Sequence, residues 1–367
     1  MKITPIDVPG YEKVAKAEDP ESGLVAFIAV HDTTLGPALG GLRLWQYESD
    51  DAALPDGLRL SRGMTFKSSV ASTGRGGGKS VINAPISAKT PALLEAMGRF
   101  VDSFGGKYIT AEDVNVDVPD LIEVRKGTQH VTGLPRDMGG SGNPSPYTAR
   151  GCFVGLRATA IEAFGTDDLN GKVVALQGPG HVGFPLGQML VEQGAKIIVA
   201  DVNQANIDQA VKELGAEVVD PAAIYDVECD IYSPCALGAT LNDETIPRLK
   251  CKAIAGAANN QLADEVKHAQ MLKERGIAYA PDSVINAGGI INVSLELEVG
   301  GYNEERAVAK IDNIFHALQN IYATAKDKDI TTHQAAQAVA EANLAAGRAQ
   351  GGSGDGDTAP AANGANA

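Results

Sequence analysis

Hydrophobic positions along the chain follow two periods, one typical of strands and one typical of helices, and the two alternate. A short apolar run rich in β-branched residues at 23–31 predicts a strand, and the Gly/Pro-rich segment at 35–41 predicts a turn. Leucines and a methionine recur at roughly helical spacing between 52 and 70. We expect the glycine run 74–78 to end this helix.

The same alternation continues through the rest of the N-terminal half. The segment SVINAP at 80–85 predicts a second strand, 91–104 an amphipathic helix, and KYITAED at 107–113 a third strand that ends in acids. The stretch 138–151 is dense in turn-forming residues and predicts a hinge between two halves.

The second half begins with a predicted helix over 148–164. The segment 172–203 then reads as strand, glycine turn, helix and strand, which is a βαβ unit. Further strand candidates at DIYSPCA, KAIAGAAN and IAYAPDSVIN predict a doubly wound parallel sheet. A helical pattern runs from 304 to 346.

The length of 367 residues is too great for one ordinary core and suits two domains with a cleft between them. We therefore predict an α/β fold with a substrate-binding and catalytic domain at 1–145 and a Rossmann dinucleotide-binding domain at 146–330. A helical segment over about 331–348 could pack back on the first domain. The small, polar tail at 349–367 is expected to be disordered.

The formal net charge of −15 disfavours nucleic acid or an anionic membrane surface as the main partner, so a small molecule is expected. The four cysteines show neither C-x-x-C pairing nor metal-ligand spacing with histidine, and no metal is predicted. The sequence starts without an apolar signal region and contains no run of about 18 apolar residues. We expect a cytoplasmic protein.

A glycine motif marks the start of the predicted Rossmann domain. Residues 178–183 spell G-x-G-x-x-G between the apolar run VVAL and a helical segment, so backbone amides there can face a pyrophosphate. Asp201 ends the next strand, where a carboxylate accepts from a ribose 2′-hydroxyl and repels a 2′-phosphate. This favours NAD over NADP, while a tight turn without any ligand is the alternative. The predicted cofactor contacts are Gly178, Pro179, Gly180, His181, Val182, Gly183, Asp201 and Val202.

Lys79 follows the glycine run GRGGG and at first resembles the lysine of a phosphate-binding P-loop. The P-loop pattern needs a further glycine where this sequence has Thr73, so a kinase or NTPase is disfavoured. A lysine in a glycine-lined pocket beside a second cation, here Lys67, can instead serve in acid–base chemistry. Asp113, with Glu112 before it, ends a strand and could be a base. Surface lysines and a solvated acidic loop are the plain alternatives.

Eight ordered blocks resemble the glutamate/leucine/phenylalanine/valine dehydrogenase family, and within it the leucine-specific members most closely. They span nearly the whole chain: LGPALGGLRLW (35–45), GMTFKSSVASTGRGGGKSVI (63–82), YITAEDV (108–114), GGSGNPSPYTARG (139–151), GPGHVG (178–183), DIYSPCALG (230–238), AGAANNQL (255–262) and INAGGIINV (285–293). The resemblance implies reversible, NAD-dependent oxidative deamination of a branched-chain or other apolar L-amino acid to the 2-oxo acid, ammonia and NADH, by a homo-oligomer.

The resemblance also implies roles for individual residues. Lys67 would hold the substrate carboxylate, Lys79 would activate the attacking water, and Asp113 would carry protons to and from the amino nitrogen. Asn259 and Asn286 would place the nicotinamide ribose and the substrate. The backbone at Cys235 and Ala236 would line the cofactor groove.

Leu39 is the residue that bears most directly on the substrate. Glutamate-specific relatives have lysine in this position of G-P-x-K-G-G, so a glutamate side chain would lack its cation here. Leu42 and the missing G-T after the acid depart from the leucine-specific pattern, which leaves a phenylalanine or tryptophan preference open. A catalytically idle nucleotide-binding regulator is the remaining alternative. The predicted substrate pocket comprises Leu39, Gly40, Ala111, Ile290 and Val293.

Overall fold

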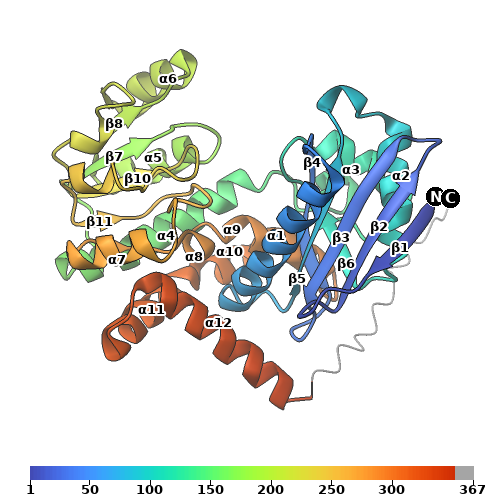
Figure 1. Cartoon of the computed structure of the whole chain (residues 1–367). Helices are drawn as coiled ribbons and strands as arrows, with labels where there is room; N and C mark the ends of the chain where they lie inside the picture. The colour runs from blue at the N-terminus through green and yellow to red at the C-terminus, as the bar shows by residue number, and fades with distance from the viewer. Residues whose placement is uncertain (352–367) are drawn as a thin grey trace. The chain divides into compact units, whose positions relative to one another are not determined.

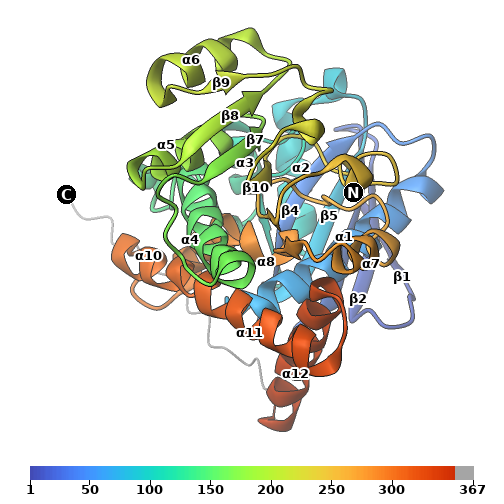
Figure 2. The same cartoon turned by 90° about the vertical axis from the view of Figure 1, so that its left-hand side faces the viewer.

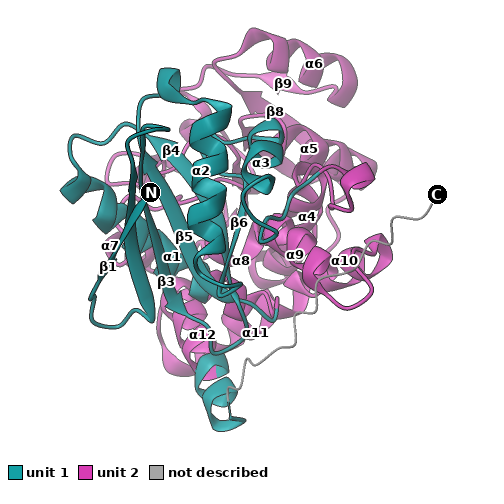
Figure 3. Cartoon of the chain, turned by 90° about the vertical axis from the view of Figure 1, so that its right-hand side faces the viewer, with its two compact units in different colours: residues 1–65, 74–134, 343–367 teal, residues 66–73, 135–342 magenta. Residues whose placement is uncertain are grey.

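The computed structural model describes residues 1–351, which form two compact units (Figure 3). Unit 1 comprises Met1–Thr65, Gly74–Leu134 and the described residues from Asn343 onward. Unit 2 comprises Phe66–Thr73 and Pro135–Ala342. The tail predicted at 349–367 lies outside the described residues except for its first three. The domain limits predicted from the sequence stay predictions.

Unit 1 is built on a mixed six-stranded sheet with the order β1-β2-β3-β5-β4-β6 (Figure 1). The pairs β1–β2, β2–β3 and β3–β5 are antiparallel, whereas β4 pairs parallel with both β5 and β6. The strands are β1 Lys2–Ile6, β2 Lys13–Asp19, β3 Leu24–Asp32, β4 Ala38–Trp45, β5 Gly76–Asn83 and β6 Tyr108–Ala111.

Helices cover both faces of this sheet, and the alternation of side chains along the strands decides what each face buries. On one face Ile28, Leu42 and Ile82 pack with α2 (Pro91–Asp102), which contacts α3 (Val118–Arg125). On the other face Phe27 and Val81 pack with the start of α1 (Asp50–Val70). Because Lys79 and Val81 are two residues apart on β5, they point to the same face, which α1 covers.

Two predictions for unit 1 are wrong in detail. The glycines expected to end the helix instead begin β5, because Gly76, Gly77 and Gly78 are paired with neighbouring strands. The turn expected at 35–41 gives way at Ala38 to strand β4. Glycine is unusual in a strand, but here it leaves room for a neighbouring side chain, since a Cβ on Gly78 would lie 2.6 Å from the Tyr108 ring.

Unit 2 contains a parallel sheet with the order β12-β11-β10-β7-β8-β9, which is the doubly wound topology predicted from the sequence (Figure 2). Its chain order reverses between β7 and β10, where dinucleotides bind in such sheets. The strands are β7 Val173–Gln177, β8 Lys196–Ala200, β9 Glu217–Val218, β10 Ile231–Pro234, β11 Ala253–Ile254 and β12 Ala278–Tyr279.

Apolar side chains of this sheet are buried on both faces, as parallel strands require. Val174 and Leu176 join a large core that includes side chains of α4 and α5, whereas Ala175 and Tyr232 join a second core with α7. The remaining elements are α4 Ser145–Phe164, α5 Gly183–Glu192, α6 Gln204–Leu214, α7 Lys267–Glu274, α8 Asp282–Ile285, α9 Gly288–Ser294, α10 Glu304–Asp312, α11 Ile314–Lys328 and α12 Thr332–Ala349, with short 3₁₀ turns η1 Ile86–Ala88, η2 Arg136–Met138, η3 Ile224–Asp226, η4 Ile246–Arg248 and η5 Leu295–Leu297.

Among residues 1–351, no helix has both the length and the apolar character needed to cross a membrane.

Phe100 on α2 provides a test of the unit 1 core. Its ring is fully buried against Phe104, with ring centroids 5.7 Å apart, so Phe100→Ala leaves a large cavity. We expect the free energy of unfolding to fall by about 3–5 kcal/mol. Ile86→Ala, at a position 58% exposed, is the matched control and should change it by less than about 0.5 kcal/mol. Denaturant titration measures both, and equal losses would contradict this core.

Candidate active site

Lys79 and Asp113 form a buried ion pair in unit 1. Lys79 lies on β5 and Asp113 follows β6, two strands away, with β4 between them. The Lys79 ammonium donates to Asp113 Oδ2, and only 5% of the Lys79 residue is exposed. The two residues singled out from the sequence as a catalytic pair are therefore in direct contact.

Gly41 makes this contact possible, because Leu42 pairs with Ser80 and thus places Gly41 beside Lys79 on β4. A Cβ on Gly41 would lie 2.7 Å from Asp113 Cβ and 2.7 Å from the carbonyl oxygen of Glu112. Such distances are shorter than van der Waals contact. The Asp113 side chain therefore reaches β5 by crossing β4 at Gly41, where β4 carries no side chain.

Burial and charge shift the titration of the pair. Burial lowers the pKa of Lys79 below its ordinary value, although the neighbouring Asp113 carboxylate acts in the opposite direction. Burial alone would raise the pKa of Asp113, but Lys79 and then Arg43 hold it below its usual range. The pKa of Glu112 is raised by burial and by the negative charges of Asp117 and Asp113. The site thus favours an ionised Asp113 and a lysine that loses its proton more readily than usual.

Arg43 is a charged residue of this site that the sequence reasoning missed. Its Nε lies 3.7 Å from Asp113 Oδ2, and its Nη1 donates to Asp56 Oδ2 at 2.9 Å. The sequence did carry a signal for it, because Arg43 is the only charged residue in the otherwise apolar strand ALGGLRLW. A charged side chain in such a strand is expected to have a specific partner. Its partners lie 13 and 70 positions further along the chain, beyond any local pattern.

The other predicted residues of unit 1 lie on two strands of the same sheet, Leu39 and Gly40 on β4 and Ala111 on β6. Leu39 is 1% exposed and pairs with Gly77 and Ile109 on the two neighbouring strands. The Gly40 carbonyl accepts from the Tyr108 hydroxyl at 2.7 Å. Ala111 ends β6, two residues before Asp113.

A second group forms around Lys67 in unit 2. Lys67 lies in the last turn of α1, and its ammonium donates to Asn286 Oδ1 at 2.6 Å. Asn286 Nδ2 donates to Asn259 Oδ1 at 2.7 Å and to the Ala257 carbonyl at 3.1 Å. Three residues predicted from separate blocks are therefore joined in one hydrogen-bonded chain. Ile290 and Val293 lie on α9, which begins two residues after Asn286.

The glycine motif adopts the geometry that a pyrophosphate site needs. Gly178 has φ +89°, and a Cβ there would lie 2.7 Å from Ala236 Cβ. A Cβ on Gly183 would meet the Gly178 carbonyl, whereas one on Gly180 would be 3.9 Å from its nearest neighbour, Asn206 Nδ2. The first and third glycines are thus required by close packing, and the second leaves open space in front of α5. This arrangement fits a dinucleotide.

Asp201 follows β8 as predicted. Its Oδ1 accepts from the Asn203 amide at 2.8 Å and its Oδ2 from Asn206 Nδ2 at 2.9 Å, which fixes the carboxylate direction. Val202 beside it is 93% exposed. His181 and Val182 complete the motif, with Val182 at the N-cap position of α5.

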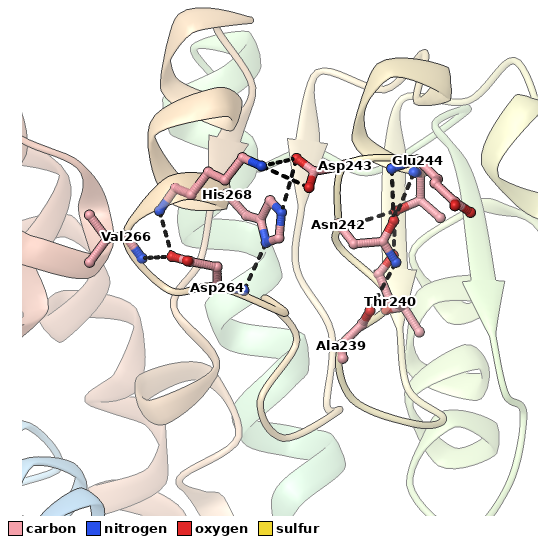
Figure 4. A network of polar contacts seen from close by, with 10 residues as sticks. Ala239, Thr240, Asn242, Asp243, Glu244, Asp264, Val266 and His268 are labelled. Carbon is pink, nitrogen blue, oxygen red and sulfur yellow. Dashed lines mark hydrogen bonds and ion pairs between the residues drawn. The ribbon is translucent and has the colours of Figure 1, made fainter.

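Cys235 and Ala236 follow β10 and pack against the glycine motif. The Cys235 amide donates to the Gln177 carbonyl at 2.8 Å, and Cys235 Sγ accepts from the Ala257 amide at 3.4 Å. The loop then continues through Asn242 and Asp243 into a polar network (Figure 4). There the buried His268 ring accepts from the Asp264 amide at 2.8 Å through Nδ1, so its Nε2 carries the proton and faces Asp243 at 3.5 Å. This network fixes the loop after β10.

The predicted residues therefore fall into three groups, one around Lys79 and Asp113, one around Lys67, and one around the glycine motif. Within the described residues, no group of three or more His, Cys, Asp or Glu side chains could hold a metal ion.

Comparison with known families gives matches in both halves of the chain. A model described as the dimerisation domain of Glu/Leu/Phe/Val dehydrogenases matches residues 12–130. A second, described as Glutamate/Leucine/Phenylalanine/Valine dehydrogenase, matches residues 201–352. Together they cover well over half of the sequence.

Individual relatives extend over nearly all of the chain. A leucine dehydrogenase from Thermoactinomyces intermedius is 53% identical over 335 residues, 91% of each chain. A phenylalanine dehydrogenase from Lysinibacillus sphaericus is 45% identical over 90% of this chain and 87% of its own. The crystal structure of L-tryptophan dehydrogenase from Nostoc punctiforme superimposes with a TM-score of 0.83 at 42% identity, covering 92% of this chain and 97% of that one.

Gly41→Ala tests the crossing of Asp113 over β4. The added methyl group must displace Asp113 or the backbone at Glu112, so we expect the free energy of unfolding to fall by about 1–3 kcal/mol. Gly63→Ala on α1 is the control, because nothing lies within 4 Å of its Cβ and alanine favours a helix by up to about 1 kcal/mol. Denaturant titration compares the two, and an unchanged Gly41→Ala variant would show that Asp113 takes another path.

Proposed function

Because the chain belongs to the Glu/Leu/Phe/Val dehydrogenase family, we propose that it oxidises a leucine-like, apolar L-amino acid with NAD. The products are the 2-oxo acid, ammonia and NADH, and the reaction is reversible. The buried contact between Lys79 and Asp113 is the observation that carries the proposal, because it provides a base and a proton donor in one water-poor site. Relatives named leucine dehydrogenase, about half identical over nine-tenths of the chain, support it.

The family implies a nicotinamide cofactor, and the glycine motif before α5 fits its pyrophosphate. A bound nicotinamide would supply the acceptor for the hydride that leaves the substrate Cα. Gly178, Gly180 and the backbone of Ala236 would line the groove, and Asp201 would accept from the adenosine ribose. The Asp201 carboxylate would repel a 2′-phosphate, which is why we propose NAD and not NADP.

Asp113 and Lys79 would divide the proton transfers between them. Ionised Asp113 accepts a proton from the substrate ammonium group, which leaves the amine ready for oxidation. After oxidation, neutral Lys79 takes a proton from the water that attacks the imino carbon, and the protonated lysine is stabilised by Asp113. The lowered pKa of Lys79 favours the neutral amine that takes this proton, and the lowered pKa of Asp113 keeps the carboxylate ionised before its own transfer.

Lys67 would hold the substrate carboxylate as a fixed positive charge. Asn286 accepts from its ammonium through one amide oxygen, and Asn259 fixes the orientation of Asn286, so the positive charge is held in one place. A bound carboxylate places the substrate Cα in a defined position, which accelerates the reaction through orientation.

Leu39 supports an apolar substrate side chain, since it is buried where a lysine would be needed to bind a glutamate carboxylate. Tryptophan and phenylalanine dehydrogenases among the relatives make an aromatic substrate the second candidate. We also propose a homo-oligomer, because the match over 12–130 is to a dimerisation domain.

The direct test is NADH formation from single L-amino acids, followed by absorbance. We expect the highest kcat/KM with leucine, isoleucine or valine, lower values with phenylalanine and tryptophan, and none with glutamate. A preference for an aromatic substrate would establish the second candidate, and no turnover with any amino acid would refute an active dehydrogenase.

Lys79→Ala locates the chemistry. We expect kcat to fall at least about a hundredfold, because the variant lacks the group that activates water, while NADH binding is retained. Lys126→Ala, at a lysine whose side chain is 54% exposed, is the control and should keep full activity. Retained turnover in Lys79→Ala would exclude the proposed role.

Asp201→Asn tests the cofactor preference. Asparagine can still accept from the Asn203 amide but no longer repels a phosphate, so we expect the ratio of kcat/KM for NADP to that for NAD to rise about tenfold. Asp208→Asn removes the same charge from an exposed position on α6 and should leave the ratio unchanged. If the NADP-to-NAD ratio of kcat/KM were the same in both variants, Asp201 would not be the residue that contacts the ribose.

A further inference from the structure

Arg43 occupies the strand that separates the two members of the ion pair. Sheet order places β4 between β5 and β6, and Arg43 pairs with Val81, two residues beyond Lys79. Arg43 and Gly41 are also two residues apart, so Arg43 lies on the same face of β4 as the gap through which Asp113 passes. The guanidinium is thus next to both reacting side chains.

Neighbouring side chains fix the guanidinium in this position. Arg43 Nη1 donates to Asp56 Oδ2 at 2.9 Å, and the Tyr47 hydroxyl donates to the same oxygen at 2.6 Å. Asp56 belongs to α1, and Arg59 donates to its other oxygen at 2.9 Å. A carboxylate with three donors has little freedom, so Asp56 holds Arg43 in one orientation.

The Nε of Arg43 is left without a hydrogen bond in this arrangement. It is buried and lies 3.7 Å from Asp113 Oδ2, the same oxygen that receives the Lys79 ammonium. A movement of about half an ångström would bring it within hydrogen-bonding distance. An unpaired buried donor is costly, so a hydrogen bond from Arg43 Nε to Asp113 is favoured. Asp113 can turn toward this nitrogen when Lys79 no longer donates to it.

We propose that Arg43 is a positioning residue for the Lys79–Asp113 pair, which keeps Asp113 ionised and oriented while Lys79 is neutral. This proposal rests on the proposed function. Without Arg43, the loss of the lysine proton would leave a buried carboxylate with no cation beside it, and that charge would draw a proton back. With Arg43, the pair always retains one cation.

The direction of the effect follows from the charges that surround Asp113. Arg43 lowers the pKa of Asp113 and also lowers that of Lys79, because a cation favours the anion and disfavours a second cation. Removing it therefore raises both pKa values, and the groups required in deprotonated form titrate at higher pH. The charged and titratable neighbours on the adjoining elements are Lys79 on β5, Arg43 on β4, Tyr108 on β6, Asp56 on α1, Tyr47 after β4, and Glu112 and Asp117 after β6.

The experiment is the pH profile of kcat/KM for amino-acid oxidation in Arg43→Gln. We expect the limb that reports loss of a proton to move about one pH unit upward, near the lower end of the range for a neighbouring charge because the Arg43 side chain is 21% exposed. Arg43→Lys restores the charge and should return the limb toward its original pH. An unchanged limb in Arg43→Gln, with activity lowered equally at every pH, would overturn the proposal.

Arg59→Gln is the matched control. It also removes a cation bound to Asp56, but the Arg59 side chain is 62% exposed, on the far side of that carboxylate. We expect its profile to coincide with that of the unaltered chain. An equal shift in Arg59→Gln would show that general charge, and not the position of Arg43, sets the titration.

A measurement without turnover separates this proposal from the proposed function. In chain labelled with ¹⁵N-lysine, the Nζ resonance of Lys79, assigned by its loss in Lys79→Arg, reports the lysine pKa directly. We expect its midpoint to rise in Arg43→Gln and to stay in place in Arg59→Gln. Absence of turnover in the unaltered chain would refute the function, whereas an unmoved Lys79 midpoint in Arg43→Gln would refute the role of Arg43.

Discussion

The buried contact between the Lys79 ammonium and the Asp113 carboxylate constrains the structure around it. Removing one charge from water costs several kcal/mol, and the mutual attraction repays this only in favourable geometry with further partners. The contact spans two strand intervals, so it needs β4 to carry no side chain at Gly41. A second cation lies beside the contact, because Arg43 on β4 approaches Asp113 and Asp56 on α1 holds Arg43 in place.

These requirements explain why unit 1 has an unusual composition at its centre. Glycines at 40, 41 and 76–78 would weaken an ordinary sheet, since each gives up side-chain packing. Here a Cβ at Gly77 would meet Thr65 of α1, and one at Gly78 would meet Tyr108. The strands therefore give up side-chain packing at these positions so that α1 and the Tyr108 ring can approach β5, and at Gly41 so that Asp113 can pass. The apolar residues around α2 supply the core.

How far the sequence predicted the structure depended on whether the signal was local. The βαβ unit from Val173 to Ala200 was foreseen, because continuous apolar strands, a glycine turn and a helix follow one another within 28 residues. The strands β11 and β12 lie within the candidates KAIAGAAN and IAYAPDSVIN and were also foreseen. The short strand β9 and the N-terminal strands β1 and β2 were not, because they carry too few residues or too mixed a pattern. Arg43 and Gly41 were missed as site residues, because their importance arises from Asp113, which is distant in sequence and reaches them only through the order of the strands.

The two glycine-rich segments show why composition alone misleads. In 178–183 the second glycine faces open space before α5, so its backbone is available to a ligand. In β5, Gly77 and Gly78 lie in a central strand paired with β3 on one side and β4 on the other, so their amides belong to the sheet and cannot surround a phosphate. The lysine after them is therefore not a phosphate ligand of the P-loop kind. Strand pairing on both sides, which a motif does not encode, directs Lys79 to Asp113.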